Sequence, residues 1–294
     1  EISACLVGSE MCIRDSDNDP SKINDSTYFK TPGMATSGAY VVSEINEDSF
    51  VYTARDDYYR GTPSVKKVVI KTIGSGSTKQ IEFENGGIDY MRVTSAEDLK
   101  KYKEESDKYN MYSISEARLN YLQLNPHGPV MSTLSQDARK AIFLALDKDA
   151  IVDFAWGSNE LAEPANSLIT PDQSIYNKDC KGYNFNLEEA KKLAKSSGLE
   201  GKELTYIYNS DRANMEAVAT VVQQQLAEIG VTVNIESCDT STFFPRFFAS
   251  KDKELATTWD LGTNGWDSQR GSNCGQAISY FTNRLCDCGY SDDC

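Results

Sequence analysis

The segment that decides the fold is LTYIYNSDRANMEAVATVVQQQLAEIGVTVNIE, residues 204–236. Its two ends, 204–209 and 231–236, are rich in β-branched and aromatic residues, which predicts a strand at each. Between them we expect a helix over 212–229 that ends at Gly230. Its apolar residues recur every three or four positions and should form one stripe against the sheet: Met215, Val218, Val222, Leu226 and Ile229. The segment therefore predicts a β-α-β unit and an α/β lobe.

Upstream of this unit the sequence predicts a strand and two further capped helices. Asn120–Asn125 reads as a strand, and residues 136–146 carry apolar side chains at helical spacing. Asp147 is placed to cap the turn that follows, and Asn186 begins a capping box before a helix over 188–196. The lobe is therefore expected to contain further helices upstream of the β-α-β unit.

The N-terminal part of the chain has the pattern of an antiparallel sheet. Runs at 39–45 and 49–54 flank a polar turn, which predicts a hairpin, and 65–73 predicts a third strand. We expect residues 80–83 to continue this sheet. The glycine- and serine-rich segment 74–79 lacks the spacing of a phosphate-binding loop and is read as a flexible turn. Ser95 should cap an exposed, charged helix.

Composition excludes several classes of function. The 294 residues include 44 acidic and 30 basic side chains, a net charge of −14, so neither nucleic acid nor an anionic membrane surface is expected as a partner. The single histidine, His127, disfavours most histidine-dependent catalysis. A hydrolase built from carboxylates such as Asp56, Asp57 or Asp267 is the enzymatic alternative, but no spacing selects a pair. We therefore expect no catalytic residues.

The cysteines do not define a metal site. Residues 1–16, with Cys5 and Cys12, resemble a translated sequencing adapter, and we exclude them as a probable artefact. Cys286, Cys288 and Cys294 crowd the end of the chain with a CxC spacing, whereas zinc sites normally pair two CxxC-type knuckles. Disulfides in an oxidising compartment and a corrupted tail are the alternatives to a thiolate site. No metal or cofactor is expected.

Five motifs occur in a distinctive order: TSGAY at 36–40, DYYRGTP at 57–63, GGID at 86–89, DARKAIFLALDKDAI at 137–151, and WDL followed by GW at 259–266. Together they resemble the family-5 extracytoplasmic solute-binding proteins of oligopeptide and dipeptide ABC transporters, over about residues 36–283. The resemblance implies a two-lobe, periplasmic-binding-protein-like α/β fold of class II. It assigns 17–118 and 259–294 to a first lobe that is incomplete in this chain, and 119–258 to a second α/β lobe.

The resemblance also places a ligand site at the Gly-Trp strand. In the family this strand commonly reads GW-x-AD, and its aspartate meets the ammonium group of a peptide. Here the candidate ligand-binding residues are Gly265, Trp266, Asp267 and Gln269, with neutral Gln269 where that aspartate would stand. Three interpretations stay open: Asp267 replaces it in a shifted register, the ligand is not a simple peptide, or sequence errors have altered the site.

By this resemblance the chain is expected to be a non-enzymatic, substrate-binding component of an ABC importer. It would capture an oligopeptide, a dipeptide or a related small solute between its lobes, as a monomer, and deliver it to the membrane permease. Its expected place is the periplasm or, as a lipoprotein, the outer face of the cell membrane. The signal segment and part of the first lobe are expected to be missing from this fragment. The alternatives are a ligand-sensing module of the same fold and the carboxylate-based hydrolase.

Overall fold

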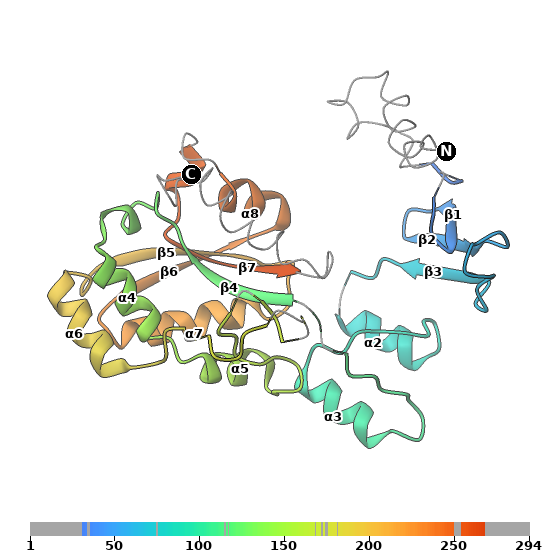
Figure 1. The fold of residues 1–294 in the computed structure, drawn as a ribbon, viewed down its shortest axis with the longest axis horizontal. Helices are drawn as coiled ribbons and strands as arrows, with labels where there is room; N and C mark the ends of the chain where they lie inside the picture. Colours follow the sequence, from blue (N-terminus) through green and yellow to red (C-terminus); the bar gives the residue numbers. More distant parts are fainter. Residues whose placement is uncertain are drawn as a thin grey trace. The chain divides into compact units, whose positions relative to one another are not determined.

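The computed structural model describes residues 31–33, 36–74, 76–114, 116, 118–167, 169–171, 173, 176–180, 182–249 and 254–267. These residues divide into two compact units, one that ends at Arg92 and one that begins at Val93. The described part of the first unit contains a sheet and the helix α2 (Gly76–Glu84), and the second unit contains a sheet and several helices (Figure 1).

The first unit is built on a three-stranded antiparallel sheet. Its strands are β1 (Tyr40–Ile45), β2 (Ser49–Ala54) and β3 (Lys67–Lys71), in the order β1-β2-β3. The predicted hairpin and third strand are therefore confirmed. Val51 is the one buried residue among those described in this unit, so the unit has little core of its own.

The expectation that residues 80–83 extend this sheet is wrong. They lie in helix α2 (Gly76–Glu84). The segment contains lysine, glutamine and glutamate, which favour a helix, and these outweigh the two apolar residues that suggested a strand. The ammonium of Lys71 at the end of β3 donates to the carbonyl of Gly87 at 2.8 Å and lies 3.5 Å from the Glu82 carboxylate. These contacts tie α2 to the sheet.

The second unit contains a mixed sheet and most of the helices. Its elements are α3 (Ala96–Glu104), β4 (Arg118–Leu124), α4 (Gln136–Leu144), α5 (Lys148–Trp156), α6 (Leu187–Ser197), β5 (Glu203–Asn209), α7 (Met215–Ala227), β6 (Thr232–Cys238), α8 (Thr240–Phe247) and β7 (Leu261–Asp267). The predicted caps are confirmed, because the side chains of Ser95, Asp147 and Asn186 each accept a backbone N–H from the first turn of α3, α5 and α6.

The sheet of the second unit has the strand order β4-β7-β5-β6. Strand β5 pairs in parallel with both β6 and β7, and β4 pairs with β7 in antiparallel fashion. Helix α7 connects β5 to β6, as the sequence of residues 204–236 predicts. The α/β class of the fold is confirmed.

The sheet of the second unit joins residues that the sequence analysis assigned to different lobes. Strand β7 is hydrogen-bonded to β4 and β5, so residues 261–267 share one sheet with residues 203–209. Helix α3 also falls in this unit. Strand pairing joins residues that are far apart in the sequence, so the order of the motifs along the chain does not predict it. The division of the chain into two lobes is therefore a proposal, with β4 and β7 as candidate crossing strands.

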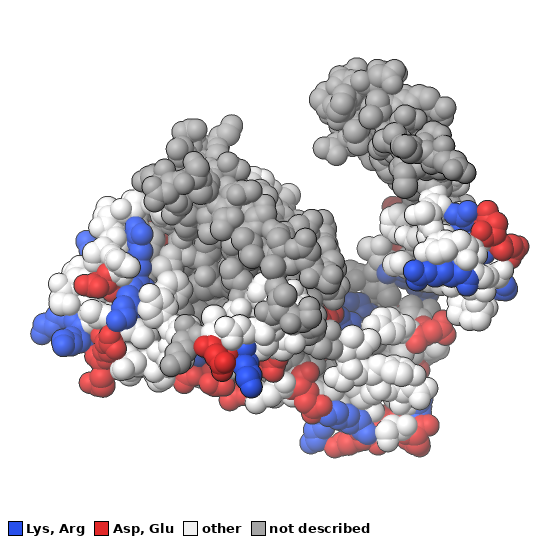
Figure 2. Space-filling model, in the orientation of Figure 1, with Lys and Arg blue, Asp and Glu red and all other residues white. Residues whose placement is uncertain are grey.

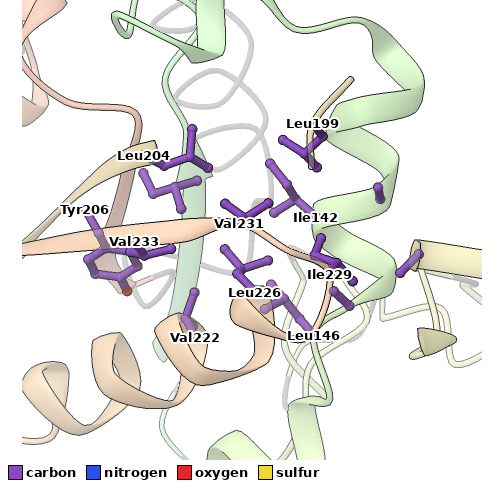
Figure 3. Packing of buried hydrophobic residues seen from close by; sticks show 14 of the residues in the cluster. Ile142, Leu146, Leu199, Leu204, Tyr206, Val222, Leu226, Ile229, Val231 and Val233 are labelled. Carbon is purple, nitrogen blue, oxygen red and sulfur yellow. The ribbon is translucent and has the colours of Figure 1, made fainter. Parts of the chain in front are cut away.

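One face of the sheet carries the main hydrophobic core. Side chains from α7, β5, β6 and the helix α4 belong to one buried cluster, and the stripe predicted from the sequence lies within it (Figure 3). Leu226 is completely buried there, as are Ile142 and Leu204. The hydroxyl of Tyr206 is hydrogen-bonded to that of Thr263, and burial raises the pKa of Tyr206. The core therefore joins β5 to β7 as well as to the helices.

The opposite face is covered by α8, a helix that the sequence did not predict. Pro245 lies within it, and a proline in an aromatic run argues against a helix in sequence alone. Phe247 of α8 stacks on Trp259, with ring centroids 5.0 Å apart, and the Trp259 indole N–H donates to the carbonyl of Arg246 at 3.0 Å. This second cluster, with Ile207 and Phe243, completes a helix–sheet–helix arrangement (Figure 1).

No helix among the described residues is long and apolar enough to cross a lipid bilayer. On the face shown in Figure 2, acidic and basic side chains of the described residues are interspersed rather than gathered into a single field.

Replacing Leu226 with alanine should lower the free energy of unfolding by about 2–5 kcal/mol, because the side chain is completely buried and leaves a cavity. The matched control is Leu255→Ala, since Leu255 is 44% exposed and its truncation should change stability by less than about 0.5 kcal/mol. Urea unfolding followed by circular dichroism measures both. Equal effects of the two substitutions would contradict the assignment of the core.

Candidate functional site

The candidate site lies on the paired strands β4 and β7. Their antiparallel ladder joins seven residue pairs, from Leu124 opposite Leu261 at one end to Arg118 opposite Asp267 at the other. The first end is fixed by a cluster of buried polar groups. The second end holds Gly265, Trp266 and Asp267, three of the four residues that the family resemblance assigned to ligand binding.

At the fixed end, the carboxylate of Asp260 is completely buried and accepts three backbone hydrogen bonds. Its Oδ1 accepts from the N–H groups of Val130 at 2.8 Å and Met131 at 2.7 Å, and its Oδ2 accepts from Thr205 at 3.1 Å. A buried carboxylate is tolerated only where such donors replace water. Asp260 therefore joins the start of β7 to the loop after β4 and to β5.

Asn125 completes this buried polar cluster from the end of β4. Its amide Nδ2 donates to the carbonyls of Ala256 at 2.8 Å and Trp259 at 2.6 Å, and its Oδ1 accepts the N–H of His127 at 3.1 Å. Asn125 therefore has a structural role at the end of β4. We call Asn125 and Asp260, with the backbone groups that they bind, the polar clasp.

Gly128 allows the two segments of the polar clasp to approach closely. A Cβ atom at this position would lie 2.5 Å from the carbonyl oxygen of Trp259 and 2.6 Å from Oδ1 of Asp260. Neither atom can move without breaking the polar clasp. Glycine is therefore required here because a side chain would clash with these atoms, and not because of the backbone conformation.

At the other end of the ladder, Gly265 has no side chain, so two polar side chains of β4 can lie against it. A Cβ atom at Gly265 would lie 2.6 Å from Nη2 of Arg118 and 2.8 Å from Oδ1 of Asn120. Asn120 is the register partner of Gly265, and its Oδ1 is buried without a hydrogen-bond partner among the described residues. Two polar groups of β4 are thus brought directly over the Gly-Trp strand.

The structure describes three of the four predicted site residues. Gly265 lies in β7 and is in contact with β4, and the backbones of Trp266 and Asp267 continue the same strand opposite Leu119 and Arg118. Gln269 lies outside the described residues. Sequence reasoning missed Arg118 and Asn120. The alternation of polar and apolar residues at 118–121 was the available signal, but the register that sets them beside Gly265 is not local.

The carboxyl ends of the parallel strands lie at this same end of the sheet. Strands β5, β6 and β7 end at Asn209, Cys238 and Asp267, and in open α/β sheets ligands bind outside such ends. A polar network ties two of the loops there: the N–H of Thr240 donates to Asp211 at 2.8 Å, and the Asn209 amide donates to the Thr240 hydroxyl at 3.1 Å. These hydrogen bonds join the loop after β5 to the first residue of α8.

The described residues contain no group of three or more His, Cys, Asp or Glu side chains placed to hold a metal ion. The clustered cysteines at 274–294 lie outside them. Of the carboxylates considered for hydrolysis, Asp57 is paired with Arg55 at 2.9 Å, which lowers the pKa of Asp57. A carboxylate held ionised by its own arginine is poorly suited to act as a general acid near neutral pH.

Residues 12–284 match the family described as bacterial extracellular solute-binding proteins, family 5. The chain belongs to this family. The fold agrees: a substrate-binding protein of an ABC transporter, CtaP from Listeria monocytogenes, matches 83% of this chain and 48% of its own with a TM-score of 0.70 and 27% identity.

Two curated relatives differ in the ligand that their names give. The probable D,D-dipeptide-binding periplasmic protein DdpA of Escherichia coli is 22% identical over 83% of this chain and 45% of its own length. Heme-binding protein A of Haemophilus influenzae is 22% identical over 80% of this chain and 42% of its own length. The chain therefore spans less than half the length of these relatives.

Substituting Gly128 with alanine should destabilise the second unit by about 1–3 kcal/mol, because the new methyl group meets backbone atoms of the polar clasp. Gly182→Ala serves as the control, since a Cβ there makes only ordinary contacts at 3.7 Å or more. Chemical denaturation of both variants measures the difference. A Gly128→Ala protein as stable as the control would show that the polar clasp does not require the close approach.

Proposed function

We propose that the protein is a non-enzymatic, extracytoplasmic binding component of an ABC importer, which captures a peptide or a related small solute and delivers it to the membrane permease. The observation that carries the proposal is the β4–β7 ladder, clasped at one end and presenting the Gly-Trp strand at the other. Membership in a family of extracellular solute-binding proteins supports the same conclusion.

In this proposal the ligand lies against the free end of the ladder. Peptide binders of this kind recognise an extended ligand by its backbone and leave its side chains in wet, tolerant pockets. The backbone of Gly265 would pair with the ligand as a strand edge, and Trp266 would form a wall of the site. Asp267 and Gln269 would supply polar groups for the ends of the ligand. Binding then favours a closed form of the protein through contacts that only that form makes.

The ligand class is proposed as peptide or peptide-like because a dipeptide-binding relative and the ordered motifs both favour it. The heme-binding relative is the reason to keep a related small solute within the proposal. We further propose a monomer in the periplasm or anchored by lipid to the outer face of the membrane. A sensing module of the same fold would use the same binding step but would not need a permease.

The experiment is ligand capture by the purified 294-residue chain from an equimolar library of di- to pentapeptides. We expect retention of a subset of the library, identified by mass spectrometry after washing, and recovered intact. Trp266→Ala should weaken binding of the retained peptides at least about 10-fold by calorimetry, as expected for loss of an aromatic contact. The matched control is Phe154→Ala, whose ring on α5 is 58% exposed.

Two outcomes would contradict the proposal. If no peptide is retained while a small non-peptide solute is, the ligand class is wrong. If retained peptides are recovered as cleavage products whose amount grows with time, the protein is a hydrolase and not a carrier.

A further inference from the structure

We propose that Arg118 and Asn120 make the free end of the β4–β7 ladder selective for a carboxylate that follows an amide N–H, as at the C-terminus of a peptide, over an ammonium group. This inference rests on the proposed function, because it names the part of a peptide that this end of the site takes. Neither residue was among the site residues predicted from the sequence.

The position of Arg118 is the first argument. Its Nη2 lies against Gly265, at 2.6 Å from the place where a side chain would begin, so the guanidinium extends over the strand that is proposed to hold the ligand. A guanidinium is always protonated and presents five N–H donors in a plane that matches a carboxylate. Its charge repels an ammonium group brought to the same place.

The second argument is the unsatisfied carbonyl oxygen beside it. Oδ1 of Asn120 lies on the same side of Gly265, at 2.8 Å from the same point, and is buried without a hydrogen-bond partner among the described residues. Such an oxygen needs an N–H donor, and leaving it without one is unfavourable. A ligand with an amide N–H next to a carboxylate would donate the N–H to Oδ1 of Asn120 and place the carboxylate against the guanidinium of Arg118.

Arg118 stands in the last pair of the ladder, opposite the backbone of Asp267. A guanidinium has five N–H donors, so Arg118 can bind a ligand carboxylate in addition to a group of the protein.

The test uses three probes with one backbone and different charge. They are N-acetyl-tetraalanine with a free carboxylate, N-acetyl-tetraalanine amide without charge, and tetraalanine amide with a free ammonium. For the unaltered chain, calorimetry should give the tightest binding for the carboxylate probe, at least about 10-fold tighter than for the ammonium probe.

Three variants separate charge from shape. Arg118→Gln should bring the carboxylate and neutral probes to within about 3-fold of each other, whereas Arg118→Lys should keep most of the preference. Asn120→Asp keeps the shape of the side chain but sets a carboxylate beside Gly265. It should weaken binding of the carboxylate probe and leave binding of the other two probes unchanged. The control is Lys192→Gln, which removes one exposed positive charge from α6, at the opposite end of the sheet from Asp267 (Figure 1), and should change nothing.

The outcomes distinguish this inference from the proposed function. Equal affinity of the unaltered chain for all three probes, or tightest binding of the ammonium probe, would overturn the inference and leave peptide capture standing. A carboxylate preference that survives Arg118→Gln would also overturn it. If none of the three probes binds, and the peptide library is not retained either, the proposed function fails and the inference fails with it.

Discussion

The carboxylate of Asp260 is the interaction on which the rest of the second unit depends. It is completely buried, and its charge is compensated by the N–H groups of Val130, Met131 and Thr205. Those groups come from the loop after β4 and from β5, while Asp260 itself precedes β7. One side chain thus holds together three chain segments that are distant in sequence, and removing it would leave three buried donors without an acceptor.

The function proposed for the protein depends on the end of the β4–β7 ladder that lies away from Asp260. Because the ladder of β4 and β7 is fixed where Leu124 meets Leu261, its other end can carry polar groups instead of core. Arg118, Asn120 and Gly265 meet there, beside the carboxyl ends of the parallel strands. The arrangement sets polar side chains of β4 beside Gly265 on a ladder whose other end is fixed, which suits the proposed binding function.

Local physics made much of the fold predictable. The stripe of α7 and the caps Asp147 and Asn186 are properties of a few neighbouring residues, and each is found as predicted. Elements that depend on distant partners were not predictable. Helix α8 contains Pro245 and is stabilised by Trp259 from the segment before β7, and the place of β7 between β4 and β5 is set by pairing alone. For the same reason the Gly-Trp motif pointed to Gly265, but Arg118 and Asn120 became candidates only through the register.

The most direct test of this account is hydrogen exchange at single amides in the unaltered chain and in Asp260→Asn. The account predicts that the amides of Val130, Met131 and Thr205 are as protected as that of Val222 in the core of α7. In the variant, these three amides should lose protection while Val222 keeps it. Fast exchange at the three amides in the unaltered chain, or exchange that the substitution leaves unchanged, would contradict the central place given to Asp260.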